Sequence, residues 1–217
     1  MLYDSAPSRF LEKIAAMGSD HGPAKAGHCR DPLQCCVVGY DAIVLGAGGM
    51  GGAALYHLAR REARVLGIEQ FTVPHDRGSS HGVSRIIRLA YWEHPDYVPL
   101  VRRAYDLWRD LERTTGQALL TVTGNIDGGR PDSRPIQGAL AACRAHGLEH
   151  ERLDAAALTS RFPGYRLPAD HVAVFQPDGG FLHAERCVVA HVDAARALGA
   201  TVHTEEKVIA WTATGGS

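Results

Sequence analysis

The sequence of 217 residues has almost no excess charge of either sign, and this lack limits its partners. Its formal net charge is −1, with 22% charged and 45% hydrophobic residues, which is the composition of a soluble globular protein. Near-neutrality gives no general attraction to nucleic acid or to an anionic membrane, so any anion site must be local. We therefore expect neither nucleic acid nor a membrane among its partners.

Other absences narrow the class of protein further. No uninterrupted apolar run reaches the ~20 residues of a membrane-spanning helix, and no basic region followed by an apolar core marks a secretory signal. An odd number of cysteines, five, predicts reduced thiols in a cytoplasmic protein rather than a disulfide framework. His28, Cys29, Cys35 and Cys36 match no common zinc spacing, and the dispersed histidines form no H-E-x-x-H arrangement. The sequence therefore predicts no metal site.

The most informative feature that is present is a glycine-rich turn between two apolar runs. G-x-G-x-x-G at Gly46, Gly48 and Gly51 follows apolar residues 42–45, and an amphipathic stretch leads to a second apolar run and Glu69. This order is typical of a βαβ dinucleotide-binding unit, although a bare glycine turn can also serve only to pack a helix. The three glycines permit the tight turn, the approach of a pyrophosphate and close helix packing, and amides at the helix N-terminus hold the phosphate charge. Glu69, 18 residues beyond Gly51, is placed to accept from ribose hydroxyls.

The rest of the chain alternates helical and extended patterns, which predicts an α/β fold. Apolar periodicity and terminal glycines predict helices over 8–17, 97–115, 136–146 and 184–198, a short helix capped by Asp154, and strands over 119–123, 172–175, 201–203 and 208–211. Residues 1–39 share no pattern with the remainder of the chain, and we expect a mobile, disordered extension. The chain stops just after a predicted strand, leaving a sheet edge uncovered, so we expect a truncated N-terminal portion of a longer protein.

A second informative segment, residues 74–88, comes directly after the expected ribose-binding acid. It contains three arginines, two histidines and three serines. Ser79 and Ser80 can supply hydroxyl and backbone donors to phosphate or ribityl oxygens. Arg85 and Arg88 lie at i and i+3, on one face if the segment is helical, where two guanidinium groups would make an anion pocket. The alternative is a solvated basic loop with surface ion pairs.

These residues resemble one family of flavoproteins. The pattern is Pro74-His75-x-x-Gly78-Ser79-x-His81-Gly82-x-x-Arg85-Ile86-Ile87-Arg88-x-Ala90-Tyr91, followed by Tyr97-Val98-Pro99-Leu100. It resembles the flavin-dependent amine oxidases of the monomeric sarcosine oxidase, N-methyltryptophan oxidase and pipecolate oxidase group. Weaker similarity continues to Lys207-Val208, so that the resemblance covers nearly everything after residue 39.

The resemblance implies FAD as the cofactor and assigns roles to particular residues. The ADP part would contact Gly46, Gly48, Gly51 and Glu69. The path to the flavin ring would be lined by Ser79, Ser80 and His81. The backbone of Val208 would lie by the adenine. Arg85 resembles an arginine that lies beside the flavin in the family. Arg88 resembles the arginine that binds the substrate carboxylate, and Tyr91 resembles a tyrosine of the active-site loop. The implied fold is a three-layer, Rossmann-like FAD-binding lobe formed by residues 40–120 and 184–217, with residues 121–183 beginning an α+β substrate lobe.

The implied function is oxidation of the C–N bond of a secondary or N-methyl amino acid, with molecular oxygen as the acceptor and an imine and hydrogen peroxide as the products. We expect a monomer in the cytoplasm, with a peroxisomal address beyond Ser217 left open. The family's covalent flavin attachment site lies in its C-terminal half and has no counterpart in this chain. Trp92 is bulkier than the small residue expected after the loop tyrosine. Two alternatives stay open: a nicotinamide-dependent dehydrogenase that shares only the βαβ unit, and a non-catalytic fragment that binds FAD.

Overall fold

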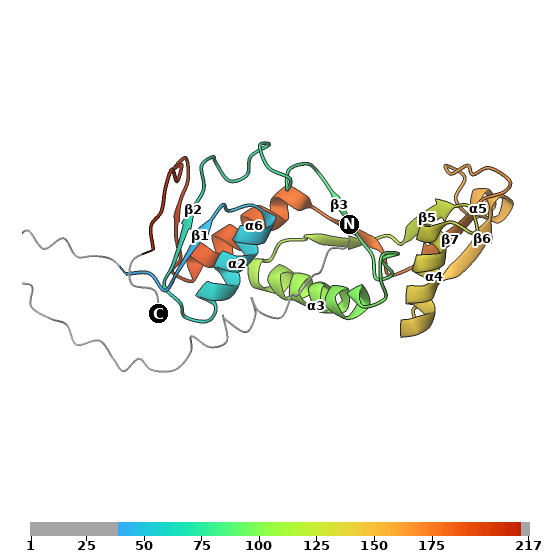
Figure 1. Ribbon diagram of the computed structural model, residues 1–217, viewed down its shortest axis with the longest axis horizontal. Helices are drawn as coiled ribbons and strands as arrows, with labels where there is room; N and C mark the ends of the chain where they lie inside the picture. Colours follow the sequence, from blue (N-terminus) through green and yellow to red (C-terminus); the bar gives the residue numbers. More distant parts are fainter. Residues whose placement is uncertain (1–38, 214–217) are drawn as a thin grey trace, which may run out of the picture. The chain divides into compact units, whose positions relative to one another are not determined.

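A computed structural model describes residues 39–213, in which helices and strands alternate (Figure 1). The strands are β1 (Ala42–Leu45), β2 (Val65–Ile68), β3 (Arg85–Ile87), β4 (Leu120–Val122), β5 (Asn125–Gly129), β6 (Glu151–Asp154), β7 (Val172–Gln176), β8 (Gly180–Leu182) and β9 (Thr201–His203). The helices are α2 (Gly49–Ala59), α3 (Tyr97–Thr115), α4 (Arg134–His146), α5 (Ala155–Arg161) and α6 (Ala184–Ala197). The α/β fold expected from the sequence is confirmed.

A parallel sheet in the order β1-β2-β9 carries the glycine turn. Leu45 pairs with Ile68, and Ile68 pairs with His203, so the carboxyl ends of the three strands meet at one edge. In open parallel sheets ligands bind outside this edge, because the loops that leave the strands there can surround a cofactor. The second apolar run thus enters the sheet next to the first, as the βαβ prediction requires.

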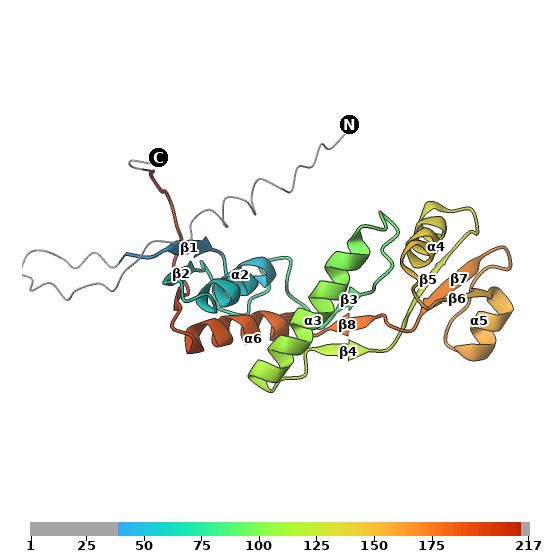
Figure 2. The ribbon, with the colours of Figure 1, turned by 90° about the horizontal axis from the view of Figure 1, so that it is seen from below.

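The hydrophobic core lies on one face of this sheet, between the strands and helices α2 and α6 (Figures 1 and 2). Leu55 and Tyr56 from α2 and Val192 from α6 are almost fully buried and pack in one cluster with Val65. Strand side chains alternate between the two faces, and the opposite face is apolar but open. Its residues Ile43 and Leu45 are 59% and 57% exposed.

Two antiparallel sheets complete the fold, in the orders β3-β8-β4 and β5-β7-β6. Helix α3 is fixed to the first of them by Glu112, whose Oε1 accepts hydrogen bonds from the backbone N–H groups of Leu119 (2.7 Å) and Leu120 (2.8 Å). Helix α4 packs against the second through Ile136 and Leu140, which cluster with Val172 and Val174. Within residues 39–213, no helix has both the length and the apolarity that crossing a membrane would require.

Most of the predicted elements are confirmed within one or two residues. Helix α3 has the predicted bounds, and Asp154 caps α5 by accepting from Ala157 N–H at 2.8 Å. The predicted helix over 8–17 lies outside the described residues. The strand predicted over 208–211 is wrong, since the backbone after His203 turns at Glu205, with φ of 60°, and then continues without regular structure. In the described part of the chain that segment has no neighbouring strand with which to pair.

The helical reading of the arginine segment is also wrong. Arg85 to Ile87 form β3, which pairs with Leu182 to Gly180 of β8. Positions i and i+3 face opposite sides of an extended chain, so the geometric premise for placing Arg85 and Arg88 on one helix face is lost. Strands β3, β5, β6 and β8 were not predicted from the sequence.

Candidate cofactor site

A cavity of about 660 Å³ lies at the carboxyl edge of the parallel sheet. This volume is in the range of about 300 to 1,000 Å³ found for sites of organic ligands. All seven predicted cofactor-binding residues line it, namely Gly46, Gly48, Gly51, Glu69, Ser79, Ser80 and Val208. The four predicted catalytic residues, His81, Arg85, Arg88 and Tyr91, are not among the residues that line it. The structure therefore brings the first group together and leaves the second outside this cavity.

The glycine turn has the geometry of a cradle. Gly46 has φ of +88°, a conformation that favours glycine, and its N–H donates to the Ile68 carbonyl at 2.8 Å. A Cβ on Gly51 would lie 1.8 Å from the Gly46 oxygen, so only glycine permits this approach of helix to turn. A Cβ on Gly48 would contact only Ser80 Oγ, at 3.8 Å, which leaves the space in front of the helix N-terminus open. The turn thus fits a group that needs close contact with backbone amides, as a pyrophosphate does.

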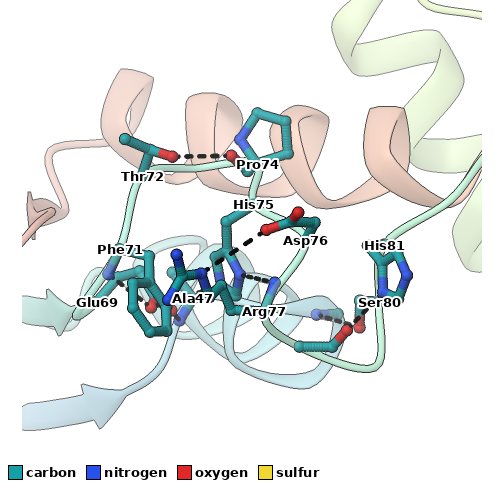
Figure 3. A network of polar contacts seen from close by, with 12 residues as sticks. Ala47, Glu69, Phe71, Thr72, Pro74, His75, Asp76, Arg77, Ser80 and His81 are labelled. Atoms are coloured by element: carbon teal, nitrogen blue, oxygen red, sulfur yellow. Dashed lines mark hydrogen bonds and ion pairs between the residues drawn. The ribbon is translucent and has the colours of Figure 1, made fainter.

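Glu69 is turned inward and joins two backbone segments (Figure 3). Its side chain is buried, and Oε2 accepts from Ala47 N–H at 2.8 Å while Oε1 accepts from Phe71 N–H at 3.1 Å. Each carboxylate oxygen has two lone pairs, so one acceptor position on each remains for other donors. Glu69 therefore fixes the glycine turn to the end of β2, and the ribose contact expected from the sequence stays a prediction.

His75 supports Glu69 from the loop after β2. Its Nδ1 accepts from Arg77 N–H at 3.0 Å, which places the ring proton on Nε2 in the neutral side chain. That nitrogen lies 3.5 Å from Glu69 Oε1. The Phe71 ring packs against the imidazole at a centroid separation of 5.0 Å, so that the side chains at the start of the loop form one contiguous group.

The later part of the loop reaches the N-terminus of α2 (Figure 3). Ser80 Oγ accepts from Gly49 N–H at 3.1 Å, in the first turn of the helix. His81 Nδ1 donates to the Gly78 carbonyl at 2.7 Å, and the imidazole therefore stabilises the loop. Ser80 stands where an anion at the helix N-terminus would also bind, since both would use the same amides.

Arg85 stabilises this loop through hydrogen bonds to its backbone. Its guanidinium donates to the carbonyl oxygens of Ser84 (2.8 Å), Ser79 (2.7 Å) and His81 (2.6 Å). Three carbonyl acceptors hold the charge in place without neutralising it. The sequence alone did not indicate this role, because carbonyl orientation depends on the folded loop.

Glu185 fixes the same loop to helix α6. Its Oε1 accepts from Gly82 N–H at 2.8 Å, across 103 positions of sequence. Gly82 has φ of +98°, so the backbone there is in a conformation that favours glycine. Sequence reasoning missed Glu185, whose only local signal is an acid in the first turn of a predicted helix.

Arg88 lies apart from Arg85, in a different environment. Its guanidinium carbon lies 4.7 Å from the centre of the Tyr91 ring, and its Nε lies 3.7 Å from Asp127 Oδ1. Burial raises the pKa of the Asp127 carboxyl, while the charge of Arg88 acts in the opposite direction. The structure therefore brings two of the predicted catalytic residues, Arg88 and Tyr91, together with an acid that sequence reasoning missed.

Within residues 39–213, no group of three or more His, Cys, Asp or Glu side chains is arranged to hold a metal ion. The polar groups of the cavity instead suit an extended anionic ligand with hydroxyl groups. Amides at a helix N-terminus, the Ser79 and Ser80 loop, and the Glu69 carboxylate supply donors and acceptors at successive places along it.

Comparison with known proteins decides the family. The model of the DAO family, described as FAD dependent oxidoreductase, matches residues 41–217. The chain belongs to this family of FAD-dependent oxidoreductases. The assignment favours FAD over the nicotinamide alternative, and the family resemblance expected from residues 74–100 is confirmed.

Curated members of the FAD-dependent oxidoreductase family are similar along most of this chain. The monomeric sarcosine oxidase of Streptomyces avermitilis is 46% identical over 172 residues, which are 79% of this chain and 45% of that protein. The human peroxisomal sarcosine oxidase is 40% identical over 170 residues (78% and 43%), and the N-methyl-L-tryptophan oxidase of Salmonella arizonae is 37% identical over 160 residues (74% and 43%). The chain thus spans less than half the length of these relatives.

Solved structures of amino acid oxidases share the fold. NikD, described as an unusual amino acid oxidase essential for nikkomycin biosynthesis, superposes in its open form with a TM-score of 0.69 at 32% identity. The superposition covers 76% of this chain and 43% of NikD. Glycine oxidase from Bacillus cereus, at 20% identity and a TM-score of 0.67, shows the same fold.

Proposed function

We propose that the full-length protein is an FAD-dependent oxidase of secondary or N-methyl amino acids, with molecular oxygen as the acceptor. The observation that carries this proposal is the gathering of all seven predicted cofactor residues around one cavity at the carboxyl edge of the parallel sheet. The names of the relatives, sarcosine oxidase and N-methyl-L-tryptophan oxidase, support the substrate class.

The cofactor half of the proposal assigns a task to each part of the cavity. The amides at the start of α2, beside Gly46, Gly48 and Gly51, would hold the pyrophosphate. Glu69 would use its remaining lone pairs for ribose hydroxyls, Ser79 and Ser80 would contact the chain that leads to the flavin, and the Val208 backbone would border the adenine. FAD itself supplies the acceptor for the electrons that leave the substrate.

The substrate half rests on residues outside the cavity. Arg88 would bind the substrate carboxylate through two parallel hydrogen bonds, with Tyr91 packed on its guanidinium. Arg85 would place a positive charge beside the redox ring, and His81 would keep the loop there ordered through its hydrogen bond to Gly78. Fixing the carboxylate orients the reacting C–N bond, and such positioning lowers a barrier by several kcal/mol.

The domain division is part of the proposal. Residues 40–120 and 184–217 would form the FAD-binding lobe, which is supported by the pairing of β9 with β2. Residues 121–183 would begin the substrate lobe, which is supported by the sheet β5-β7-β6. We further propose a monomeric cytoplasmic enzyme, with a peroxisomal location as the alternative.

The cofactor proposal is tested by the absorbance spectrum of the purified full-length gene product. A flavin spectrum and peroxide formation from sarcosine or another N-methyl amino acid are the expected results. A colourless protein that binds no added FAD would contradict the proposal. The 217-residue chain, assayed beside it with added FAD, tests the alternative that this polypeptide binds FAD without turnover.

The substrate proposal is tested by Arg88→Ala in the full-length protein. Loss of a charged contact costs about 2 to 4 kcal/mol, so KM should rise roughly 30- to 1,000-fold while FAD stays bound. Unchanged steady-state kinetics would reject the role of Arg88. Arg130→Ala is the control, because this arginine is exposed and pairs with Asp132 and Asp170.

A further inference from the structure

Arg88 has an unusual local environment for a charged side chain. Its side chain is 18% exposed, and its Nε is buried with no hydrogen-bond partner among the described residues. The nearest carboxylate oxygen, Asp127 Oδ1, is 3.7 Å from Nε, which is within ion-pair range but beyond a hydrogen bond. The guanidinium is thus close to an opposite charge without being bonded to it.

Asp127 is held firmly from the side opposite to Arg88. Its Oδ2 accepts from Asn125 Nδ2 at 3.0 Å and from Gln176 Nε2 at 3.2 Å. Gln176 is 2% exposed, and its Oε1 accepts from the backbone N–H of Ala90, two residues beyond Arg88. A buried amide therefore connects the acid to the backbone of the segment that carries the arginine, which fixes the separation of the two charges.

The charged and titratable groups around Asp127 come from several elements. Burial is the main cause of the raised pKa of Asp127; Arg88 is the opposite charge, and Glu93 is a like charge that adds to the effect of burial. The Tyr91 ring covers one side of the guanidinium, and the buried thiol of Cys143 in α4 also interacts with the acid. Asn125 and Gln176 supply neutral amide donors. Asp127 is thus the partly buried carboxylate that balances Arg88.

We propose that Asp127 is a positioning residue for Arg88 and the internal anion with which a substrate carboxylate competes. The inference rests on the proposed function, in which Arg88 binds that carboxylate. Without a ligand, the acid keeps the guanidinium in place at 3.7 Å. When a ligand carboxylate binds, two negative charges share one positive charge, so the affinity is lower than an unbalanced arginine would give.

This arrangement has a consequence for pH. Protonation of Asp127 removes the competing charge, so carboxylate ligands should bind more tightly as the pH falls through the titration of this acid. By linkage, a bound carboxylate must raise the pKa of Asp127 by the same coupling. A residue that served only to hold the fold would not produce this dependence.

The test uses the full-length protein with bound FAD and methoxyacetate as the probe. Methoxyacetate has the carboxylate of sarcosine with oxygen in place of nitrogen, so it has no amine to oxidise. Its dissociation constant is measured by calorimetry and by the change in flavin absorbance, above the pH at which the probe itself is protonated. Asp127→Asn keeps the size of the side chain and an acceptor for the two amides, and Asp132→Asn is the control, because Asp132 is 80% exposed and pairs with Arg130.

We expect Asp127→Asn to bind methoxyacetate roughly tenfold more tightly than wild type and to lose the increase in affinity at low pH. Asp132→Asn should match wild type. Equal or weaker binding by Asp127→Asn would overturn the proposal, as would an affinity of the wild type that does not change with pH. The wild-type profile needs no variant, so a flat profile would overturn the proposal even if Asp127→Asn fails to fold.

Arg88→Met separates this inference from the function on which it rests. If that variant binds methoxyacetate as well as wild type does, or if the wild type does not bind it, the carboxylate role of Arg88 is wrong and this proposal is overturned with it. If Arg88→Met weakens binding while Asp127→Asn leaves it unchanged, only the role of Asp127 is wrong.

Discussion

Replacement of Gly51 by alanine tests the close approach on which the glycine turn depends. The new Cβ would lie 1.8 Å from the Gly46 oxygen and 2.9 Å from its carbon. A carbon–oxygen contact needs about 3.3 Å, so the helix and the turn would have to separate by roughly 1.5 Å. Overpacking typically costs about 1 to 3 kcal/mol, and the cost should lie near the upper limit here because backbone must move.

Gly52→Ala in the same helix is the matched control. Its Cβ would meet Val192 Cγ2 at 3.4 Å and His191 Cβ at 3.5 Å, both ordinary contacts. Both substitutions gain about 1 kcal/mol of helix propensity, so this contribution cancels in the comparison. Gly52→Ala should therefore be as stable as wild type or slightly more stable, and Gly51→Ala should be less stable than Gly52→Ala by roughly 2 to 3 kcal/mol.

Urea unfolding of the two variants measures this difference directly, since the slope with denaturant is expected to be shared. FAD titration of the same samples should show weakened binding for Gly51→Ala alone, because the displaced turn no longer presents its amides. Free energies of unfolding that agree within about 1 kcal/mol would show that the close approach does not constrain the fold as argued.

Three further predictions concern buried polar groups. Glu69→Ala leaves the buried N–H of Ala47 without its acceptor, so urea unfolding should show a loss of roughly 2 to 4 kcal/mol, whereas a loss below about 1 kcal/mol would contradict the bridging role. Burial lowers the pKa of His191 to about 4, so its unfolded form takes up a proton first. Wild-type stability should accordingly fall relative to His191→Gln by roughly 3 kcal/mol between about pH 6.5 and about pH 4, and equal pH slopes for the two proteins would contradict this. Burial raises the pKa of the Cys143 thiol to about 11 and that of Cys187 to about 12, so alkylation followed by peptide mass analysis should label both only after unfolding.

The sequence was sufficient for features whose causes are local. The strand, glycine turn, helix and second strand of the βαβ unit follow from periodicity and from the conformational demands of Gly46 and Gly51. Helix α3 has a strongly amphipathic pattern and a glycine directly after its end, so its bounds were predicted without tertiary information.

The features that were missed depend on partners far along the chain. Strand β5 has two glycines and little strand propensity, yet it pairs along its whole length with β7. Strand β3 is extended because it pairs with the distant β8, although its arginine spacing also suits a helix. Asp127 acts on Arg88 and Glu185 acts on Gly82, and no local pattern marks contacts over such separations in sequence.

The three hydrogen bonds from Arg85 to carbonyl groups have a consequence for the association rate and the affinity of a cofactor. Through them one guanidinium joins residues 79, 81 and 84 and limits the conformations of this segment. Little chain entropy is then lost on docking, and preorganised surfaces of this kind gain affinity for that reason. Without the guanidinium, the loop would keep the contacts of Ser80, His81 and Gly82 but would lose those that join residues 79, 81 and 84, so a smaller fraction of molecules would be ready to bind the ligand.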